Sequence, residues 1–359
     1  MQKLLLSAAA AGFLSLTCGI ALAETAQELV DKSHKLYEQK DFKSSLDAMN
    51  EAIKLDSKNA VYYFERAKVK RTLDQVKSAI DDYSKSIELD PKVVEVWYNR
   101  GLLKWATNDK AGALSDWNKA IEINPNYANA YNNRGVSKWE SGDKEGALQD
   151  YNEAIRLDPK HPDAYSNRGV VKRAMGDMKG ALEDYKMAAD VNPTSFVFGN
   201  RGNMKVATED YKGAIEDYTK AIELNPNEGL CYVARGMAFA ALGNYDRALA
   251  DMNVAISKKP NEAKFWFQRA YVNSLINNYP QALADLEKSA SLRTTQYERG
   301  YDHAARAVVY GRNNEFAKVE PEVTQALNIF NSSSPTEKAE SRTNLSECAL
   351  ARALNSDIA

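Results

Sequence analysis

A repeat of 33 or 34 residues runs through most of the chain and constrains the fold more than any other feature of the sequence. Six prolines mark its period, with successive separations of 34, 34, 34, 33 and 34 residues: Pro91, Pro125, Pro159, Pro193, Pro226 and Pro260. Arg-Gly or Arg-Ala pairs and a set of alanines keep the same step. With each proline at position 32, repeats begin at Ala26, Ala60, Val94, Ala128, Pro162, Ser195, Gly229 and Ala263, and a degenerate ninth begins near Gly300. Such a chain is expected to stack short units rather than enclose one globular core.

Composition places the chain among soluble globular proteins. Hydrophobic residues make up 44% of its 359 residues, which argues against global disorder. The 47 Lys and Arg residues nearly balance the 49 Asp and Glu residues, giving a net charge of -2. This charge balance disfavours a protein that binds nucleic acid or an anionic membrane mainly through electrostatic attraction.

The N-terminus has the features of a signal peptide. A short basic start that ends at Lys3 precedes an almost wholly apolar stretch, and Ala21-Leu22-Ala23 supplies small residues for cleavage. We therefore expect cleavage after Ala23 and an exported protein, periplasmic or secreted. An uncleaved anchor is the alternative, because residues 4–23 are long enough to span a bilayer. No later segment is apolar enough, so no integral membrane span is expected after cleavage.

The residue pattern of each repeat predicts two helices joined by a short turn. In the repeat 94–127, Trp97 at position 4 lies one helical turn from Gly101 at position 8. Ala113 at position 20 and Trp117 at position 24 place a small and a large residue on the second helix in the same way. The proline at position 32 ends that helix, because the residue before proline is pushed out of helical geometry.

This pattern resembles that of the tetratricopeptide repeat family: an aromatic residue at position 4, Gly at 8, Ala at 20, an aromatic residue at 24, Ala at 27 and Pro at 32. The resemblance covers Ala60–Asn261 and, less well, continues to about Leu292. It implies an all-α, right-handed superhelical solenoid of stacked helix-turn-helix repeats. In such a fold the first helices line a concave groove that takes a protein or peptide ligand.

The expected domain organisation follows from the repeat boundaries. It comprises a signal peptide (1–23), an N-terminal degenerate repeat or cap (24–59), seven clear repeats (60–296), a degenerate repeat (297–333) and a C-terminal capping helix (334–359).

Position 7 departs from the family pattern, because it holds arginine on the packing face of the first helix. A buried cation needs a partner, and every clear repeat carries an aspartate at position 23. The sequence therefore predicts a structural ladder of bidentate Arg–Asp pairs. We expect a slight preference for the aspartate of the preceding repeat, as in Asp82 with Arg100 and Asp116 with Arg134. The alternative is a row of paired acids and bases that performs chemistry or binds phosphate.

Positions 2, 5, 9, 12 and 13 lie opposite the packing face and should line the groove. Position 12 is Arg71, Trp105, Trp139 and Arg173 in four consecutive repeats. Trp, Tyr and Arg dominate binding hot spots, so two tryptophans on this face indicate a contact surface. The alternative is that the rings stack on each other or on the arginines.

Asparagine recurs at position 6, at the edge of the predicted groove. A carboxamide both donates and accepts hydrogen bonds, which suits the backbone of an extended peptide; solvated asparagines are the alternative. The predicted partner-binding residues are Phe64, Arg71, Tyr98, Asn99, Trp105, Asn133, Trp139, Asn167, Arg173 and Asn200.

The sequence offers little support for catalysis, a cofactor or a metal. The three histidines fall at unrelated repeat positions without metal-binding spacing, and His161 is expected to be a solvated loop residue. After signal cleavage Cys231 and Cys348 remain. They are predicted to carry free thiols, because a linear stack separates them.

The sequence thus favours an exported, non-catalytic scaffold that binds a protein or extended peptide in its groove, without nucleic acid or metal. The alternative is a structural accessory subunit of an envelope secretion or assembly complex, which contacts partners through its convex face or its ends.

Overall fold

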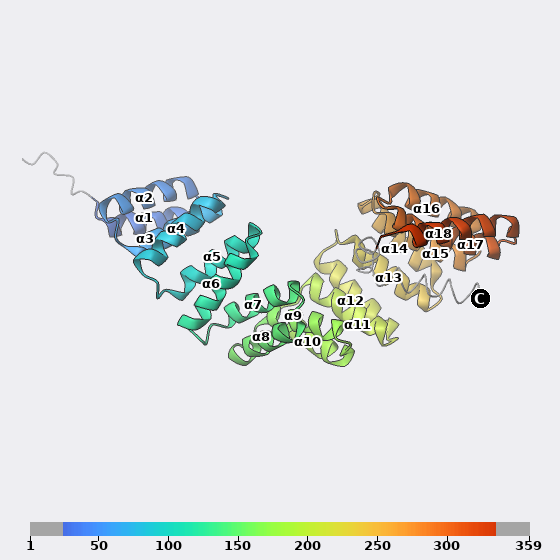
Figure 1. The fold of residues 1–359 in the computed structure, drawn as a ribbon, viewed down its shortest axis with the longest axis horizontal. Helices are drawn as coiled ribbons and strands as arrows, with labels where there is room; N and C mark the ends of the chain where they lie inside the picture. The colour runs from blue at the N-terminus through green and yellow to red at the C-terminus, as the bar shows by residue number, and fades with distance from the viewer. Residues whose placement is uncertain (1–23, 335–359) are drawn as a thin grey trace, which may run out of the picture. The chain divides into compact units, whose positions relative to one another are not determined.

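The computed structural model describes residues 24–334 (Figure 1). The predicted signal peptide and its cleavage site, most of the predicted capping helix, and Cys348 lie outside these residues. Within them every regular element is helical, as the sequence predicted. The elements are α1 (Ala26–Glu38), α2 (Phe42–Leu55), α3 (Ala60–Thr72), α4 (Val76–Leu89), α5 (Val94–Ala106), α6 (Lys110–Ile123), α7 (Ala128–Glu140), α8 (Lys144–Leu157), α9 (Pro162–Ala174), α10 (Met178–Val191), α11 (Ser195–Ala207), α12 (Tyr211–Leu224), α13 (Gly229–Ala241), α14 (Tyr245–Lys258), α15 (Ala263–Leu275), α16 (Tyr279–Leu292), α17 (Gln296–Arg312), the 3-10 helix η1 (Phe316–Lys318) and α18 (Val319–Ser332).

The turn inside each repeat has the same backbone conformation. Position 15 is left-handed in every repeat: Lys40, Asp74, Asn108, Gly142, Gly176, Glu209, Gly243, Asn277 and Asn314. An aspartate often follows as the N-cap of the second helix, and Asp143 accepts a hydrogen bond from the Gly146 backbone N–H at 2.9 Å. These two local features reverse the chain and start the second helix.

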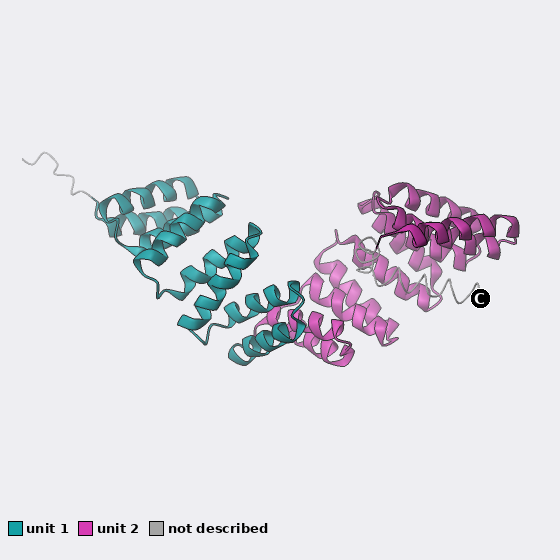
Figure 2. Cartoon of the chain, in the orientation of Figure 1, with its two compact units in different colours: residues 1–158 teal, residues 159–359 magenta. Residues whose placement is uncertain are grey.

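The helices form hairpins, and the hairpins stack in sequence order within two compact units (Figure 2). The first unit comprises residues 1–158 and contains α1–α8. The second comprises residues 159–359 and contains α9–α18. In each unit the second helix of one hairpin packs on the first helix of the next, for example α12 on α13.

Glycine at position 8 lets the two helices of a hairpin approach closely. A Cβ atom built on Gly101 would lie 2.6 Å from Nε1 of the buried Trp117, and one on Gly135 would lie 2.7 Å from Cε1 of Tyr151. The ring at position 24 therefore occupies the space that a side chain at position 8 would need. This contact explains the paired spacing of Gly and aromatic residues in the sequence.

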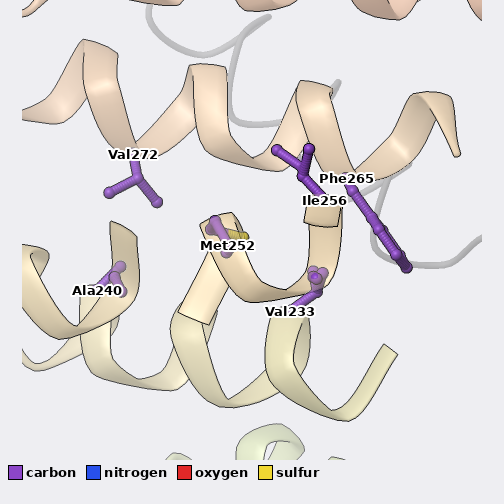
Figure 3. Packing of buried hydrophobic residues seen from close by; sticks show 8 residues of the cluster. Val233, Ala240, Met252, Ile256, Phe265 and Val272 are labelled. Carbon is purple, nitrogen blue, oxygen red and sulfur yellow. The ribbon is translucent and has the colours of Figure 1, made fainter. Parts of the chain in front are cut away.

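The apolar contacts between successive repeats recur at fixed positions (Figure 3). Ile256 at position 28 of one repeat shares a buried cluster with Phe265 at position 3 of the next, and Met252, Val233 and Val272 complete the cluster. Elsewhere Ile53 and Tyr62 occupy the same two positions in another buried cluster. Each hairpin thus covers part of its neighbour's apolar surface, which supplies the stability that one hairpin lacks.

His161 is buried, so the prediction of a solvated loop residue was wrong. It is 6% exposed and is the N-cap of α9. Its Nδ1 accepts a hydrogen bond from the Ala164 backbone N–H at 3.3 Å. The adjacent Pro162 begins the helix, as proline does at this position, and places His161 at the cap rather than in an open loop.

None of the helices in residues 24–334 combines the length and the apolar character needed to cross a membrane.

Candidate functional site

The arginines at position 7 form the predicted bidentate pairs with the aspartates at position 23. Arg134 donates from Nε to Asp150 Oδ2 at 2.8 Å and from Nη2 to Asp150 Oδ1 at 2.6 Å. The same pair occurs in seven repeats: Arg66–Asp82, Arg100–Asp116, Arg134–Asp150, Arg168–Asp184, Arg201–Asp217, Arg235–Asp251 and Arg269–Asp285. We call this set the Arg–Asp ladder.

The expected preference for the aspartate of the preceding repeat was wrong, because every partner lies 16 residues later in the same repeat. Positions 7 and 23 lie opposite each other across one hairpin. The remaining guanidinium nitrogen makes the link to the preceding repeat: Arg134 Nη1 donates to Asn118 Oδ1 at 3.0 Å. The ladder therefore holds these hairpins closed, and at Arg66, Arg100, Arg134, Arg235 and Arg269 it also joins the hairpin to the preceding one of the same unit.

A second cation reaches most of the ladder aspartates from position 11. Lys138 Nζ lies 2.9 Å from Asp150 Oδ2. The corresponding residues in the other four such repeats are Lys70, Lys104, Lys172 and Lys205. The Asp150 side chain is 4% exposed, and its hydrogen bonds raise the pKa of Arg134. The Arg134 guanidinium also lies 5.2 Å from the Tyr131 ring centroid.

All seven ladder arginines and five lysines are thus bound to buried carboxylates. The ladder is a structural feature, and its charges are directed inward rather than toward a ligand.

The degenerate ninth repeat keeps a modified ladder pair that the sequence reasoning missed. Arg306 Nε donates to Glu322 Oε1 at 3.1 Å, and these residues are also 16 apart. His303 Nδ1 lies 2.6 Å from Glu322 Oε2. With Gly300 as position 1, Arg306 and Glu322 fall at positions 7 and 23. A search for that spacing with Glu allowed in place of Asp would have found the pair.

The first unit contains seven of the ten predicted partner-binding residues: Phe64, Arg71, Tyr98, Asn99, Trp105, Asn133 and Trp139. Both tryptophans are half-buried. The Trp105 ring packs against Trp117, with ring centroids 5.6 Å apart, and Lys110 Nζ lies 5.2 Å from its centroid. Trp139 makes no comparable ring contact within residues 24–334. One face of Trp105 is therefore used for packing, and Trp139 is the less constrained ring.

The tryptophans at positions 4 and 12 are two kinds that differ in their indole hydrogen bonds, whereas Trp117 at position 24 is buried and its Nε1 is also unpaired in residues 24–334. At position 4, Trp97 and Trp266 donate from Nε1 to the carbonyl oxygens of Pro91 and Pro260, at 2.9 and 2.8 Å. At position 12, the Nε1 groups of Trp105 and Trp139 donate to no group in the described part of the chain, and both rings are partly exposed. The position-12 tryptophans thus present an aromatic surface with donors that a ligand could use.

The polar groups beside these rings are hydrogen-bonded to each other. Arg71 Nη1 donates to Asn99 Oδ1 at 3.2 Å, and Asn99 Nδ2 donates to the Glu95 carbonyl at 2.7 Å. Asn133 Nδ2 donates to Tyr98 Oη at 3.1 Å. The position-6 asparagines of this unit therefore join adjacent first helices, and ligand binding there would have to share or replace these bonds.

Phe64 is also partly engaged by its neighbours. Its ring centroid lies 5.9 Å from that of Tyr83, and Lys68 Nζ lies 5.4 Å from its centroid. Burial raises the pKa of Tyr83 to about 12, with nearby Arg71 acting in the opposite direction.

The second unit contains the other three predicted residues: Asn167, Arg173 and Asn200. All three are half-buried. Asn200 Nδ2 donates to the Phe196 carbonyl at 3.0 Å. Arg173 belongs to a different unit from Arg71, Trp105 and Trp139, so the placement of these four position-12 residues in one line along the groove stays a prediction.

Two exposed apolar residues of the second unit were not among the predicted partner-binding residues. Phe196 is 58% exposed and Leu230 is 46% exposed. Both occupy position 2, which belongs to the predicted groove face. The sequence reasoning weighed positions 5, 6 and 12 and did not inspect position 2 residue by residue.

Metal and thiol chemistry find no further support in residues 24–334. No group of three or more His, Cys, Asp or Glu side chains there could hold a metal ion. Cys231 is buried, and burial raises the pKa of its thiol. Its partner in the thiol prediction, Cys348, lies beyond the described residues, so that prediction is not tested.

Comparison with protein-family models identifies the repeats. Models described as tetratricopeptide repeats or TPR repeats match residues 60–93, 106–142, 139–176, 196–228 and 217–250. A comparison with curated proteins finds no match.

Solved structures share the fold at low sequence identity. A tetratricopeptide repeat protein from Parabacteroides merdae has a TM-score of 0.52 and 18% identity, covering 69% of this chain and 98% of that one. A chain of the APC/C hetero-tetramer Cut9-Hcn1 has a TM-score of 0.56 and 17% identity, covering 81% of this chain and 57% of that one. YrrB, described as a TPR protein with an unusual peptide-binding site, has a TM-score of 0.45 and 26% identity, covering 51% of this chain and 95% of that one.

The first two structures support the fold assignment, and the YrrB likeness carries no conclusion at that score. Together with the stacked hairpins of each unit, the family matches show that this chain carries tetratricopeptide repeats in an all-α solenoid fold.

Proposed function

We propose that this protein is an exported, non-catalytic tetratricopeptide scaffold that binds a protein or an extended peptide on the predicted groove face of its first unit. The tetratricopeptide fold is a protein-binding fold, which gives the general class of activity. The particular surface, the type of ligand and the export of the chain are parts of the proposal.

The observation that carries the proposal is the difference between the two kinds of tryptophan. Trp97 and Trp266 satisfy their indole N–H groups within the fold. Trp105 and Trp139 leave theirs without an acceptor in residues 24–334 while exposing part of each ring. A rigid ring that also offers a donor can bury much area at a low cost in side-chain entropy. Tyr98 lies at position 5 of the helix that carries Trp105 and extends the aromatic surface.

The test is capture of the native partner from the envelope fraction by the double variant Trp105→Ala/Trp139→Ala. We expect capture to be lost, with the far-UV circular dichroism of the folded protein retained. Trp105→Phe/Trp139→Phe is the matched control for packing, because it keeps a ring against Trp117 and removes both donors. Partial capture by the Phe variant would show that the aromatic ring and the indole N–H donor each contribute to binding. Undiminished capture by a folded Ala variant would reject binding on this surface.

Export is tested separately by N-terminal sequencing of the protein recovered from its own cells. The proposal expects a mature chain that begins at Glu24. A chain that retains residues 1–23 in the membrane fraction would support the anchor alternative instead.

One observation favours the alternative role of an accessory subunit that binds through an end. Leu327 is 53% exposed, although it falls at position 28, where Ile53 and Ile256 are buried against the following repeat. Phe316, in the nearby η1, is 67% exposed. Leu327→Asp with Phe316→Asp should abolish assembly if a partner binds at this end, and it should leave capture unchanged if the partner binds near Trp105.

A further inference from the structure

Two consecutive first helices in the second unit expose large apolar side chains at the same repeat position. Phe196 on α11 is 58% exposed and Leu230 on α13 is 46% exposed, and these two helices contact each other. At the same position, the first helices on either side carry Asp163 and Lys264. Within the second unit, exposure of a large apolar side chain at this position is therefore confined to α11 and α13, whereas in the first unit only α3 shows it, at Val61, which is 54% exposed.

This pair of helices presents no uncompensated formal charge. Neither α11 nor α13 contains an Asp or Glu residue, and their only cations are Arg201, Lys205 and Arg235. Arg201 and Lys205 both pair with the buried Asp217. Arg235 pairs in the same way with Asp251. All three cations are thus paired with the buried aspartates of the Arg–Asp ladder.

Small residues lie one helical turn beyond the exposed side chains. Gly199 follows Phe196 by three residues, and Ala234 follows Leu230 by four. A Cβ atom on Gly199 would have only the Cys231 Sγ within 4 Å, at 3.7 Å, so glycine is not required there by packing. In the first unit the position of Gly199 always carries a side chain, which is Val30, Phe64, Tyr98 or Asn132. Because Gly199 has no side chain, a ligand backbone can approach α11 closely beside Phe196.

Two carboxamides on α11 each keep one end available along this surface. Asn200 Nδ2 donates to the Phe196 carbonyl, and its Oδ1 accepts no hydrogen bond in residues 24–334. Asn203 Oδ1 accepts from Tyr218 Oη at 2.7 Å, and its amide group donates to no group there. An acceptor and a donor therefore lie three residues apart on one helix, which suits the alternating carbonyl and N–H groups of an extended backbone.

We infer that α11 and α13 form a second docking surface, which binds an extended, uncharged segment of a protein partner that carries apolar side chains. The inference rests on the proposed function in that the ligand is a protein segment, but it places that segment on different helices. Burial of Phe196 and Leu230 against apolar side chains is favourable. A charged residue would lose its hydration there without gaining a counter-charge. The absence of free cations also disfavours nucleic acid.

The test uses a random-sequence peptide library displayed on phage and selected on the purified protein. The enriched sequences should be depleted of Asp, Glu, Lys and Arg. One enriched peptide, labelled with fluorescein, is then titrated by fluorescence anisotropy. Raising NaCl from about 0.1 M to about 0.5 M should leave its Kd nearly unchanged, because screening affects only charged contacts.

Three variants locate the binding. Phe196→Ser/Leu230→Ser should raise the Kd of the labelled peptide at least about tenfold. Met187→Ser/Leu242→Ser is the matched control, since it removes side chains that are 41% and 45% exposed but lie outside the groove positions. That control and Trp105→Ala/Trp139→Ala should both leave the peptide Kd unchanged.

Several outcomes would overturn the inference. They are failure to enrich any sequence, enrichment of charged peptides, or equal binding by the wild type and the Phe196/Leu230 variant. Self-association of the wild type that the same variant abolishes would identify a second copy of the chain as the occupant instead. Capture of the native partner by the tryptophan variant and binding of the labelled peptide by the Phe196/Leu230 variant are separate assays. Each proposal can therefore fail while the other holds.

Discussion

Replacing a ladder arginine with methionine should cost more in the seventh repeat than in the fourth. Methionine keeps much of the length of arginine and removes its charge. Arg134→Met leaves Asp150 with Lys138 at 2.9 Å. Arg235→Met leaves Asp251 with no cation in contact within residues 24–334, because position 11 of that repeat is Phe239. The chain thus contains a matched pair of sites that differ in the second cation.

The structure sets the expected magnitudes. Arg134→Met removes two charge-assisted hydrogen bonds to one carboxylate and a cation–π contact with Tyr131. Lys138 continues to neutralise Asp150, so we expect a loss of about 2–3 kcal/mol in the free energy of unfolding. Asp251 has a side chain only 9% exposed, and a buried charge that loses its sole partner typically costs about 3–5 kcal/mol. The seventh-repeat variant should therefore be less stable by about 1–2 kcal/mol.

Urea denaturation measures both losses without changing ionic strength. A repeat array need not unfold in one step. Comparing amide hydrogen-exchange rates in α13 and α14 with those in α7 and α8 then shows which hairpin has lost stability. Equal losses in the two variants, or a larger loss in Arg134→Met, would refute the reasoning.

Three further predictions concern two buried tyrosines, one buried carboxyl group and the cysteines. Tyr185→Phe should leave stability unchanged or slightly higher, because the buried hydroxyl of Tyr185 has no hydrogen-bond partner in residues 24–334. Tyr218→Phe should cost about 1 kcal/mol for its lost hydrogen bond, and urea denaturation of both variants checks the difference. Spectrophotometric titration should show Tyr185 ionising at about 12, because burial raises its pKa to that value. Burial also raises the pKa of Asp302, so between its unfolded and folded pKa the folded chain holds a proton that the unfolded chain has lost, and the contribution of this carboxyl to stability falls as pH rises through that interval. Compared with Asp302→Asn, the wild type should therefore gain relative stability between pH 7 and pH 4, and a parallel pH dependence would contradict the assignment. After denaturation without reductant, Cys231 and Cys348 should both react with a thiol reagent, and protection of both in a monomer would indicate a disulfide.

The sequence predicted the helical repeats because their signals are local and recur many times. Proline at position 32, glycine at position 8 and the aromatic residue at position 24 each have a short-range structural cause. Gly101 and Trp117 illustrate this, since the repeat pattern identified a small residue at position 8 and an aromatic residue at position 24, and the structure shows that the two contact each other. The identity of the ladder residues followed as well, because a buried arginine needs an acid.

The partner of each arginine could not be derived from helical periodicity. The choice between Asp82 and Asp116 for Arg100 depends on how two helices of one hairpin face each other, which is a tertiary property. The same reason explains why Arg306 and Glu322 were missed, since their repeat lacks the proline that set the register. His161 was misjudged because the cap position of α9 depends on where Pro162 begins the helix.

The candidate site was predictable in register but not in detail. Position 12 identified Trp105 and Trp139, but register does not determine side-chain rotamers. It therefore could not show that Trp105 packs on Trp117 or that Asn99 accepts a hydrogen bond from Arg71. These contacts depend on neighbouring repeats, whose spacing the sequence does not give.

Site-specific photo-crosslinking to the native partner tests the central claim most directly. A photoreactive phenylalanine analogue is placed at Ala106, the exposed residue next to Trp105 on α5, and separately at Glu122 on α6, whose side chain is 68% exposed. Binding on the predicted groove face predicts a partner crosslink from position 106 and none from position 122. A crosslink from position 122 with none from position 106 would contradict the account and place the partner on the second helices.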